Sequence, residues 1–95
     1  MSGYVYILAS KMAGTLYTGV TSDLVKRISE HRNGITGGFT LKYSVHHLVW
    51  YQEYGSIEDA INQEKKIKKW RRQWKIELIE KMNPKWEDMF FRIAR

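Results

Sequence analysis

The stretches that decide the fold of this chain are YVYILA (residues 4–9) and LYTGV (residues 16–20). Both are short and rich in aromatic and β-branched side chains, which favour strands. A glycine-containing turn separates them, so we expect the two strands to pair as an antiparallel hairpin. Alternation puts Tyr17 and Gly19 on one face of the second strand, but the register that decides whether Tyr6 meets Tyr17 stays open.

A helix and a long loop are predicted to follow the hairpin. Ser22 can cap a helix over residues 23–31, and Asn33-Gly34 is a typical stop signal. Residues 33–47 carry three glycines and are expected to form a long loop, a kind of segment that often serves function.

The second half of the chain is predicted to add one strand and three helices. Residues 48–54 have the composition of a strand, and Ser56 opens helical sequence that extends to about Met82. The apolar positions drift around this helix, which favours a break near residues 70–72. Asn83-Pro84 is expected to cap and open a last short helix.

The element order β-β-α-β-α-α-α predicts one small domain over residues 1–95. Its fold class is α/β (α+β), with a three-stranded antiparallel sheet flanked by helices. With 43% hydrophobic residues, disorder is excluded as the overall state.

The composition also bears on the compartment and excludes several classes of site. The chain has no cysteine, which excludes disulfides and thiolate zinc sites and is compatible with a reducing, cytoplasmic location. The longest stretch without a charge is 11 residues, too short to span a bilayer, so no membrane partner is expected.

Positive charge is concentrated in one segment. The formal net charge is +6, from 16 Lys and Arg against 10 Asp and Glu. Residues 65–75 hold seven cations and no acid, whereas the rest of the chain has nine basic and ten acidic residues. A local basic patch is typical of proteins that bind a polyanion. A solvated helix surface is the alternative interpretation.

Glu64 stands in the apolar stripe of the predicted long helix, one turn from Ala60 and Ile67. A carboxylate in that position must be paired, protonated or bound to a metal, because an isolated buried charge is costly. Three cations of the basic segment fall near the same face of the helix: Lys68, Arg71 and Lys75. They can neutralise Glu64 or line up phosphates beside it, and the pattern leaves both open.

Arg27 and His31 lie four residues apart on one face of the first predicted helix. Arginine matches the geometry of a phosphate, and histidine can move a proton near neutral pH. The alternative is structural: Arg27 covers surface, and His31 sits where its cation suits the helix dipole.

Taken in order, these residues form a pattern. Tyr4-Val5-Tyr6, Tyr17-Thr18-Gly19, Lys26-Arg27 with His31, and Glu64 together resemble the GIY-YIG nuclease superfamily. The resemblance extends from Tyr4 to about Met82 and is nearest to the small stand-alone bacterial members. These are related to the catalytic domains of excision-repair and structure-specific endonucleases. A GIY-YIG-like fold is therefore implied.

The resemblance also implies catalytic roles. Glu64 would be the acidic metal ligand, holding one divalent cation, Mg²⁺ or Mn²⁺, together with waters and the scissile phosphate. Tyr17 would activate the attacking water, and Tyr6 would position that water or Tyr17. Arg27 would bind the phosphate, and His31 would accept a proton from Tyr17.

The resemblance and the charge pattern also indicate residues that contact nucleic acid. These are Gly19, Lys26, Lys42, Lys65, Lys68, Lys69, Arg71 and Arg72. Gly19 would keep the second strand open to substrate. Phe39 and Tyr43, on either side of Lys42, could stack on unpaired bases.

Three positions depart from the family pattern. Tyr4 stands where the name-giving glycine stands, and Val20 where excision-repair members carry a lysine. Ile76 falls where an asparagine is expected after the metal-binding glutamate. Asn83 could replace that asparagine only if the chain folds back.

These observations predict a metal-dependent DNA endonuclease that hydrolyses phosphodiester bonds, with single-stranded or branched DNA as its substrate and DNA repair as its setting. A catalytically inactive nucleic-acid-binding module of the same fold is the alternative. In a third hypothesis, the chain is a partner-dependent subunit that docks through an aromatic tail (Trp86, Phe90, Phe91). Core packing is the other interpretation of that tail.

Overall fold

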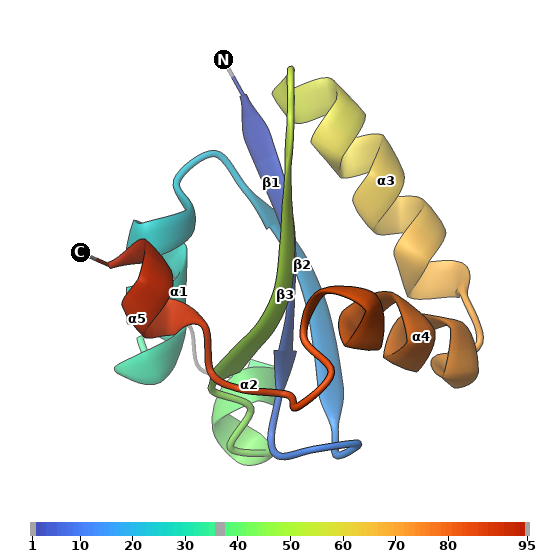
Figure 1. Ribbon diagram of the computed structural model, residues 1–95. Helices are drawn as coiled ribbons and strands as arrows, with labels where there is room; N and C mark the ends of the chain where they lie inside the picture. The colour runs from blue at the N-terminus through green and yellow to red at the C-terminus, as the bar shows by residue number, and fades with distance from the viewer. Residues whose placement is uncertain (1, 36–37, 95) are drawn as a thin grey trace.

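The computed structural model describes residues 2–35 and 38–94, which form three strands and five helices (Figure 1). In chain order these are β1 (Gly3–Ala9), β2 (Leu16–Thr21), α1 (Leu24–Arg32), α2 (Gly38–Lys42), β3 (His47–Tyr54), α3 (Ile57–Lys69), α4 (Arg72–Met82) and α5 (Phe90–Ile93). The fold class is the one predicted, with one helix more than expected. Thr36 and Gly37, in the predicted loop, lie outside the described residues.

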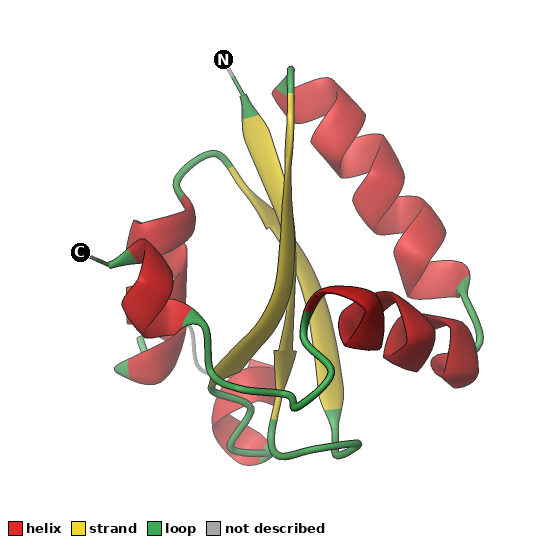
Figure 2. Ribbon diagram, viewed as in Figure 1, coloured by secondary structure: helices red, strands yellow, loops and turns green. Residues whose placement is uncertain are grey.

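The strands form one antiparallel sheet in the order β2-β1-β3 (Figure 2). Strand β1 lies in the centre, which is why its sequence is apolar on both faces. In the hairpin register, Tyr6 pairs with Gly19 and Leu8 pairs with Tyr17. This register puts Tyr6 and Tyr17 on the same face of the sheet, at diagonal positions.

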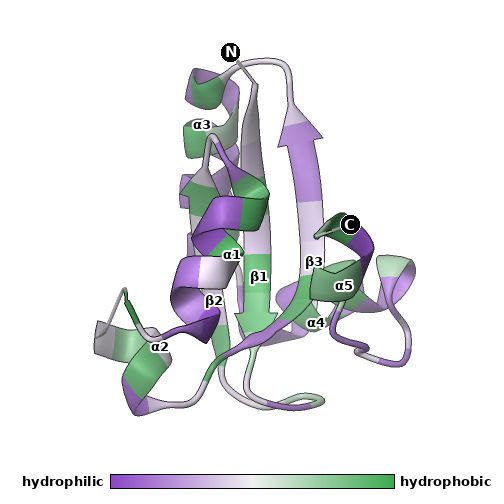
Figure 3. Ribbon diagram, turned by 90° about the vertical axis from the view of Figure 1, so that its left-hand side faces the viewer, coloured by the Kyte–Doolittle hydropathy of each residue, from purple (hydrophilic) through white to green (hydrophobic). Residues whose placement is uncertain are grey.

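Each face of the sheet carries its own core. Helices α3 and α4 cover one face, where Val5 and Ile7 pack with Ile67 and Ile79 (Figure 1). Helices α1 and α5 lie on the other face, over a cluster that includes Tyr6. Strand β3 is hydrophobic and buried near its beginning and hydrophilic towards its end (Figure 3).

Helix α1 begins one residue later than predicted. Asp23, not Ser22, is the N-cap, and its carboxylate accepts a hydrogen bond from the Lys26 amide. The prediction was wrong because both residues are good caps and the turn decides between them. Thr21 accepts from the Asp23 amide and so fixes Asp23 at the start of the helix.

The predicted loop over residues 33–47 contains helix α2, so a wholly irregular loop was a wrong prediction. Its Thr40 is buried and bonded to a histidine of α1. Val45, just after the helix, is buried in the sheet core. These tertiary contacts hold a five-residue helix that is too short to be stable alone.

The predicted break in the long helix is present. Trp70 and Arg71 have extended backbone angles and separate α3 from α4. Arg72, at the start of α4, donates hydrogen bonds to the carbonyls of Ala13 and Gly14. The hairpin turn and the start of α4 are thus joined.

The predicted role of Asn83 as the start of the last helix was wrong. Asn83 ends α4, and its buried amide donates to the carbonyls of Val49 and Glu87. Residues 84–89 are not helical, and Trp86 has a positive φ of 57°. This non-helical backbone places the Trp86 side chain in the core, where it is only 4% exposed.

The buried Trp86 bears on the docking hypothesis for the tail. Trp86 packs in the core under α3 and α4, whereas Phe91 is 69% exposed. Arg32 lies over the rings of Phe90 and Phe91 and pairs with Asp88. Packing therefore accounts for the first aromatic residue of the tail.

Among the described residues, no helix is long and apolar enough to cross a membrane.

Candidate active site

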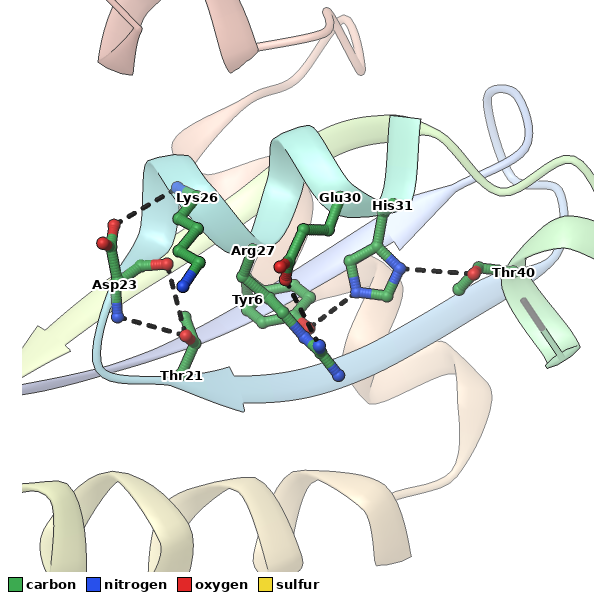
Figure 4. Close-up of polar contacts among 8 residues, drawn as sticks. All are labelled: Tyr6, Thr21, Asp23, Lys26, Arg27, Glu30, His31 and Thr40. Carbon is green, nitrogen blue, oxygen red and sulfur yellow. Dashed lines mark hydrogen bonds and ion pairs between the residues drawn. The ribbon is translucent and has the colours of Figure 1, made fainter. Parts of the chain in front are cut away.

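A buried chain of polar groups connects three elements of the fold (Figure 4). The Tyr6 hydroxyl on β1 lies 2.9 Å from Nε2 of His31 on α1. Nδ1 of His31 lies 3.2 Å from the hydroxyl of Thr40 on α2. All three side chains are buried. The alternative, a His31 cation that suits the helix dipole, is wrong: His31 lies in the last turn of α1, but its ring is buried against Tyr6 and Thr40.

The His31 ring is held in its neutral form. Burial, reinforced by the positive charge of Arg27, lowers the pKa of His31 to about 4. A neutral imidazole has one donating and one accepting nitrogen, so the hydrogen bonds run in a single direction through the ring between Tyr6 and Thr40. These two hydrogen bonds therefore fix the position of the Tyr6 hydroxyl.

The buried neutral histidine predicts a pH dependence of stability. Its folded pKa is depressed from about 6.5, so the unfolded chain takes up a proton first as the pH falls, and stability is lost between about pH 6.5 and 4. We expect His31 to contribute a loss of about 3 kcal/mol over this range. Chemical denaturation of the wild type and of His31→Gln at pH 7, 5.5 and 4.5 measures it.

The glutamine variant is expected to be less stable at pH 7 and to show a flatter pH dependence. His47→Gln, at an exposed position on β3, is the matched control and should keep the wild-type slope. An equally steep slope in His31→Gln would mean that other groups cause the dependence.

Tyr17, on the edge strand β2, is half-buried beside this chain. Its ring centroid lies 5.4 Å from that of His31 and 6.4 Å from that of Tyr6. Gly19, opposite Tyr6, is buried, and a Cβ there would lie 2.4 Å from the Tyr6 ring. The space that we expected Gly19 to leave for substrate is filled by Tyr6, so Gly19 serves the packing of the tyrosine.

Arg27 lies between the tyrosines and solvent. It is paired with Glu30 at 3.5 Å, and its side chain is 40% exposed. Burial raises the pKa of Tyr6 to about 12, against the opposing effect of the Arg27 guanidinium. Lys26 and Arg27 line one hollow of about 250 Å³. A partly exposed guanidinium beside two tyrosines is suited to bind an anion.

Glu64 lies on α3, and its buried position in the apolar stripe is confirmed. Its carboxylate is 2.9 Å from Nζ of Lys68, one turn further along the helix. Pairing with a lysine, one of the two alternatives that the sequence left open, is therefore present. The Glu64 charge acts on Tyr6, and Lys68 lines one hollow with Tyr17, because α3 packs against the edge strand β2.

The donor set of this site fits a hard divalent cation with few protein ligands. Mg²⁺ typically binds one or two carboxylates and keeps several waters or phosphate oxygens. Glu64 supplies one buried carboxylate, and the described residues contain no group of three or more His, Cys, Asp or Glu side chains that could hold a metal ion by themselves. In this structure the ammonium of Lys68 supplies the positive charge beside Glu64.

The other predicted nucleic-acid contacts lie on several elements of the fold. Lys42 lies over the ring of Tyr43, and Arg71 lies over Trp74. The guanidinium of Arg72 is bonded to the hairpin turn, which gives it a structural role. Lys65 and Lys69 are exposed on α3.

Sequence reasoning missed the role of Thr40, and it identified Lys75 only as one of three cations near the face of Glu64. Thr40 carries no sequence signal, because only the folding of α2 brings it to His31. Lys75 belongs to the basic segment, but only the packing of α4 in the fold shows that it lines a hollow with Tyr17. Asn83 is committed to β3 and the tail, so it does not supply the missing asparagine.

The geometry and the order of these residues agree with a comparison to known families. Residues 2–77 match the GIY-YIG catalytic domain. Since the match covers most of the chain, this protein belongs to the GIY-YIG nuclease family, whose substrates are nucleic acids.

Curated relatives and a solved structure are similar over nearly the full chain. A UPF0213 protein of Staphylococcus saprophyticus is 37% identical over 76 residues, covering 80% of this chain and 92% of its own length. A UPF0213 protein of Clostridium perfringens is 38% identical, covering 90% of each chain. The solution NMR structure of a UPF0213 protein from Bacillus halodurans has a TM-score of 0.58 and 31% identity, covering 94% of both chains. These matches support a small stand-alone GIY-YIG protein.

Proposed function

We propose that this protein is a metal-dependent DNA endonuclease that hydrolyses phosphodiester bonds in single-stranded or branched DNA. The observation that carries the proposal is that Tyr6, Tyr17 and Arg27 lie together and that Lys68, the partner of the buried Glu64, lines a hollow with Tyr17. Phosphodiester hydrolysis needs a carboxylate that holds a metal, a side chain that orients the attacking water, and a guanidinium that binds the phosphate.

Each side chain has a distinct task in this proposal. Arg27 binds the scissile phosphate and stabilises the charge that develops on it. Tyr17 orients the water that attacks phosphorus, and the bond to the leaving oxygen breaks as the new bond forms. The proton that the water loses passes to solvent, and solvent protonates the leaving oxygen. His31 and Thr40 hold Tyr6 in place, so His31 positions a tyrosine in this account.

Glu64 would hold a divalent cation, Mg²⁺ or Mn²⁺, which supplies charge neutralisation at the phosphate. Lys68 now balances Glu64 and would have to release it when the cation binds. Once released, the Lys68 ammonium can pair with a neighbouring phosphate.

A preference for unpaired DNA is supported by exposed aromatic rings beside the site. Phe39 and Tyr43 are both 45% exposed, and their ring centroids lie 4.8 Å apart. Bases stack on such rings whatever their sequence, whereas paired bases are not available for stacking. Action in the cytoplasm in DNA repair is the setting that we propose for this substrate.

A non-catalytic nucleic-acid-binding module is the second candidate, and two observations favour it. Lys68 already neutralises Glu64, which removes the need for a metal to stabilise a buried charge. Val20, in place of a lysine of excision-repair members, also reduces the set of catalytic groups.

Cleavage assays separate the two candidates. Labelled single-stranded, duplex and forked oligonucleotides are incubated with Mg²⁺, with Mn²⁺, or with a chelator. We expect metal-dependent cleavage of the single strand and the fork and little cleavage of the duplex. Salt-sensitive binding without cleavage in either metal would favour the binding module.

A further inference from the structure

A hollow of about 290 Å³ adjoins the site at Tyr17. Its walls come from β2, α2, α3 and α4, and they are formed by Leu16, Tyr17, Thr18, Phe39, Lys68 and Lys75. We call it the β2 hollow. It shares Tyr17 and Lys68 with the candidate active site, and Lys68 in turn contacts Glu64. A ligand in the β2 hollow would therefore lie next to the scissile phosphate.

One wall of the β2 hollow is an aromatic ring. Phe39 is 45% exposed, and its centroid lies 6.0 Å from that of Tyr17, with the two rings tilted by only 31°. Tyr43 continues the series on the other side of Phe39. The volume is just below that of pockets for drug-sized ligands, about 300 Å³ and more, and so suits a single base.

The lining of the β2 hollow also includes cations. Lys75 is half-buried there, and no carboxylate forms an ion pair with it within residues 2–35 and 38–94. Burial, followed by the charges of Arg72 and Lys68, lowers the pKa of Lys75, as expected for an ammonium among cations. Such a group gains most from an anionic ligand.

An aromatic wall and an unpaired cation in one hollow match the two parts of a nucleotide. We propose that the β2 hollow binds the unpaired nucleotide next to the scissile phosphate, with its base on Phe39 and its phosphate on Lys75. This inference rests on the proposed function and deepens it. It assigns Lys75 as a substrate-binding residue, and it gives a physical reason for strand selectivity: a base on Phe39 cannot remain paired.

Binding without cleavage tests the aromatic wall. Fluorescence anisotropy in excess chelator compares a ten-nucleotide thymidine strand with the same backbone lacking its bases. The wild type is expected to bind the strand with bases more tightly. Phe39→Ala is expected to bind that strand about tenfold more weakly than the wild type does, with no change for the strand that lacks bases. Phe39→Trp should retain the preference. Phe91→Ala, an exposed phenylalanine on α5, should bind as the wild type does.

Salt dependence tests the cation. Lys75→Met is expected to lower affinity for both strands and to reduce the slope of log affinity against log salt by about one phosphate contact. Lys85→Met, at an exposed position in the tail, should leave that slope unchanged. Circular dichroism of each variant verifies that the fold is intact.

The outcomes separate this inference from the proposed function. If Phe39→Ala and Lys75→Met bind as the wild type does while the wild type cleaves DNA, the β2 hollow is not the nucleotide site and the nuclease proposal stands. If the wild type cleaves nothing but both variants lose affinity as described, the nucleotide site stands and the nuclease proposal fails. Equal affinity of the wild type for strands with and without bases would also overturn the inference.

Discussion

Replacing Glu64 with alanine is expected to reduce DNA cleavage by about a thousandfold or more. Glu64 is the buried carboxylate proposed to hold the metal, and its charge acts on Tyr6, so its loss would remove the proposed protein ligand. The charge neutralisation that a metal supplies is worth several kcal/mol, and each 1.36 kcal/mol corresponds to about a tenfold change in rate. Single-turnover cleavage of a labelled single strand in Mg²⁺ measures the effect.

Two measurements make this prediction specific. Glu58→Gln removes an exposed carboxylate from the first turn of the same helix and should leave the rate unchanged. Binding of the strand by Glu64→Ala in chelator should be retained or improved, since Lys68 loses its partner and becomes available to phosphate. Cleavage by Glu64→Ala at the wild-type rate would rule out Glu64 as the metal ligand.

Replacing Arg27 with alanine is expected to lower the cleavage rate by about a hundredfold to a thousandfold. Loss of one preorganised donor to a developing negative charge typically has an effect of this size. Arg27 lies beside Tyr6 and is held by Glu30, so its guanidinium is already oriented at the site. Arg27→Lys should restore little of the rate, because a lysine lacks the planar, two-pronged geometry of arginine.

Lys26→Ala is the matched control for Arg27. Lys26 precedes Arg27 on α1, is exposed, and lines the same hollow. We expect it to weaken binding and to reduce its salt dependence, with the rate for bound substrate nearly unchanged. If both alanine variants affected only binding, Arg27 would be a general phosphate contact without a role in the transition state.

Much of the fold could be predicted from local signals. The hairpin, the third strand and the break after Lys69 follow from strand-forming composition, turn glycines and the drift of apolar positions around the helix. The errors lie where tertiary contacts override local preference. Asn83-Pro84 has the sequence of a helix start, but the Asn83 amide donates to the Val49 carbonyl instead. Helix α2 forms in a glycine-rich segment because Thr40 and Val45 are buried.

The sequence by itself determined which chemical groups this protein can use. Tyr6, Tyr17, Arg27, His31 and Glu64 are recognisable from their order alone, and a carboxylate in an apolar stripe signals a special environment because burying a charge is costly.

Only the tertiary structure decided how those groups are arranged. The hairpin register puts Tyr6 opposite Gly19, which gives its ring the room to reach His31. The break between α3 and α4 puts Lys75 into the β2 hollow with residues far away in the sequence. Register and helix direction depend on how two cores pack on opposite faces of one sheet, and that packing is not encoded in any short segment of the chain.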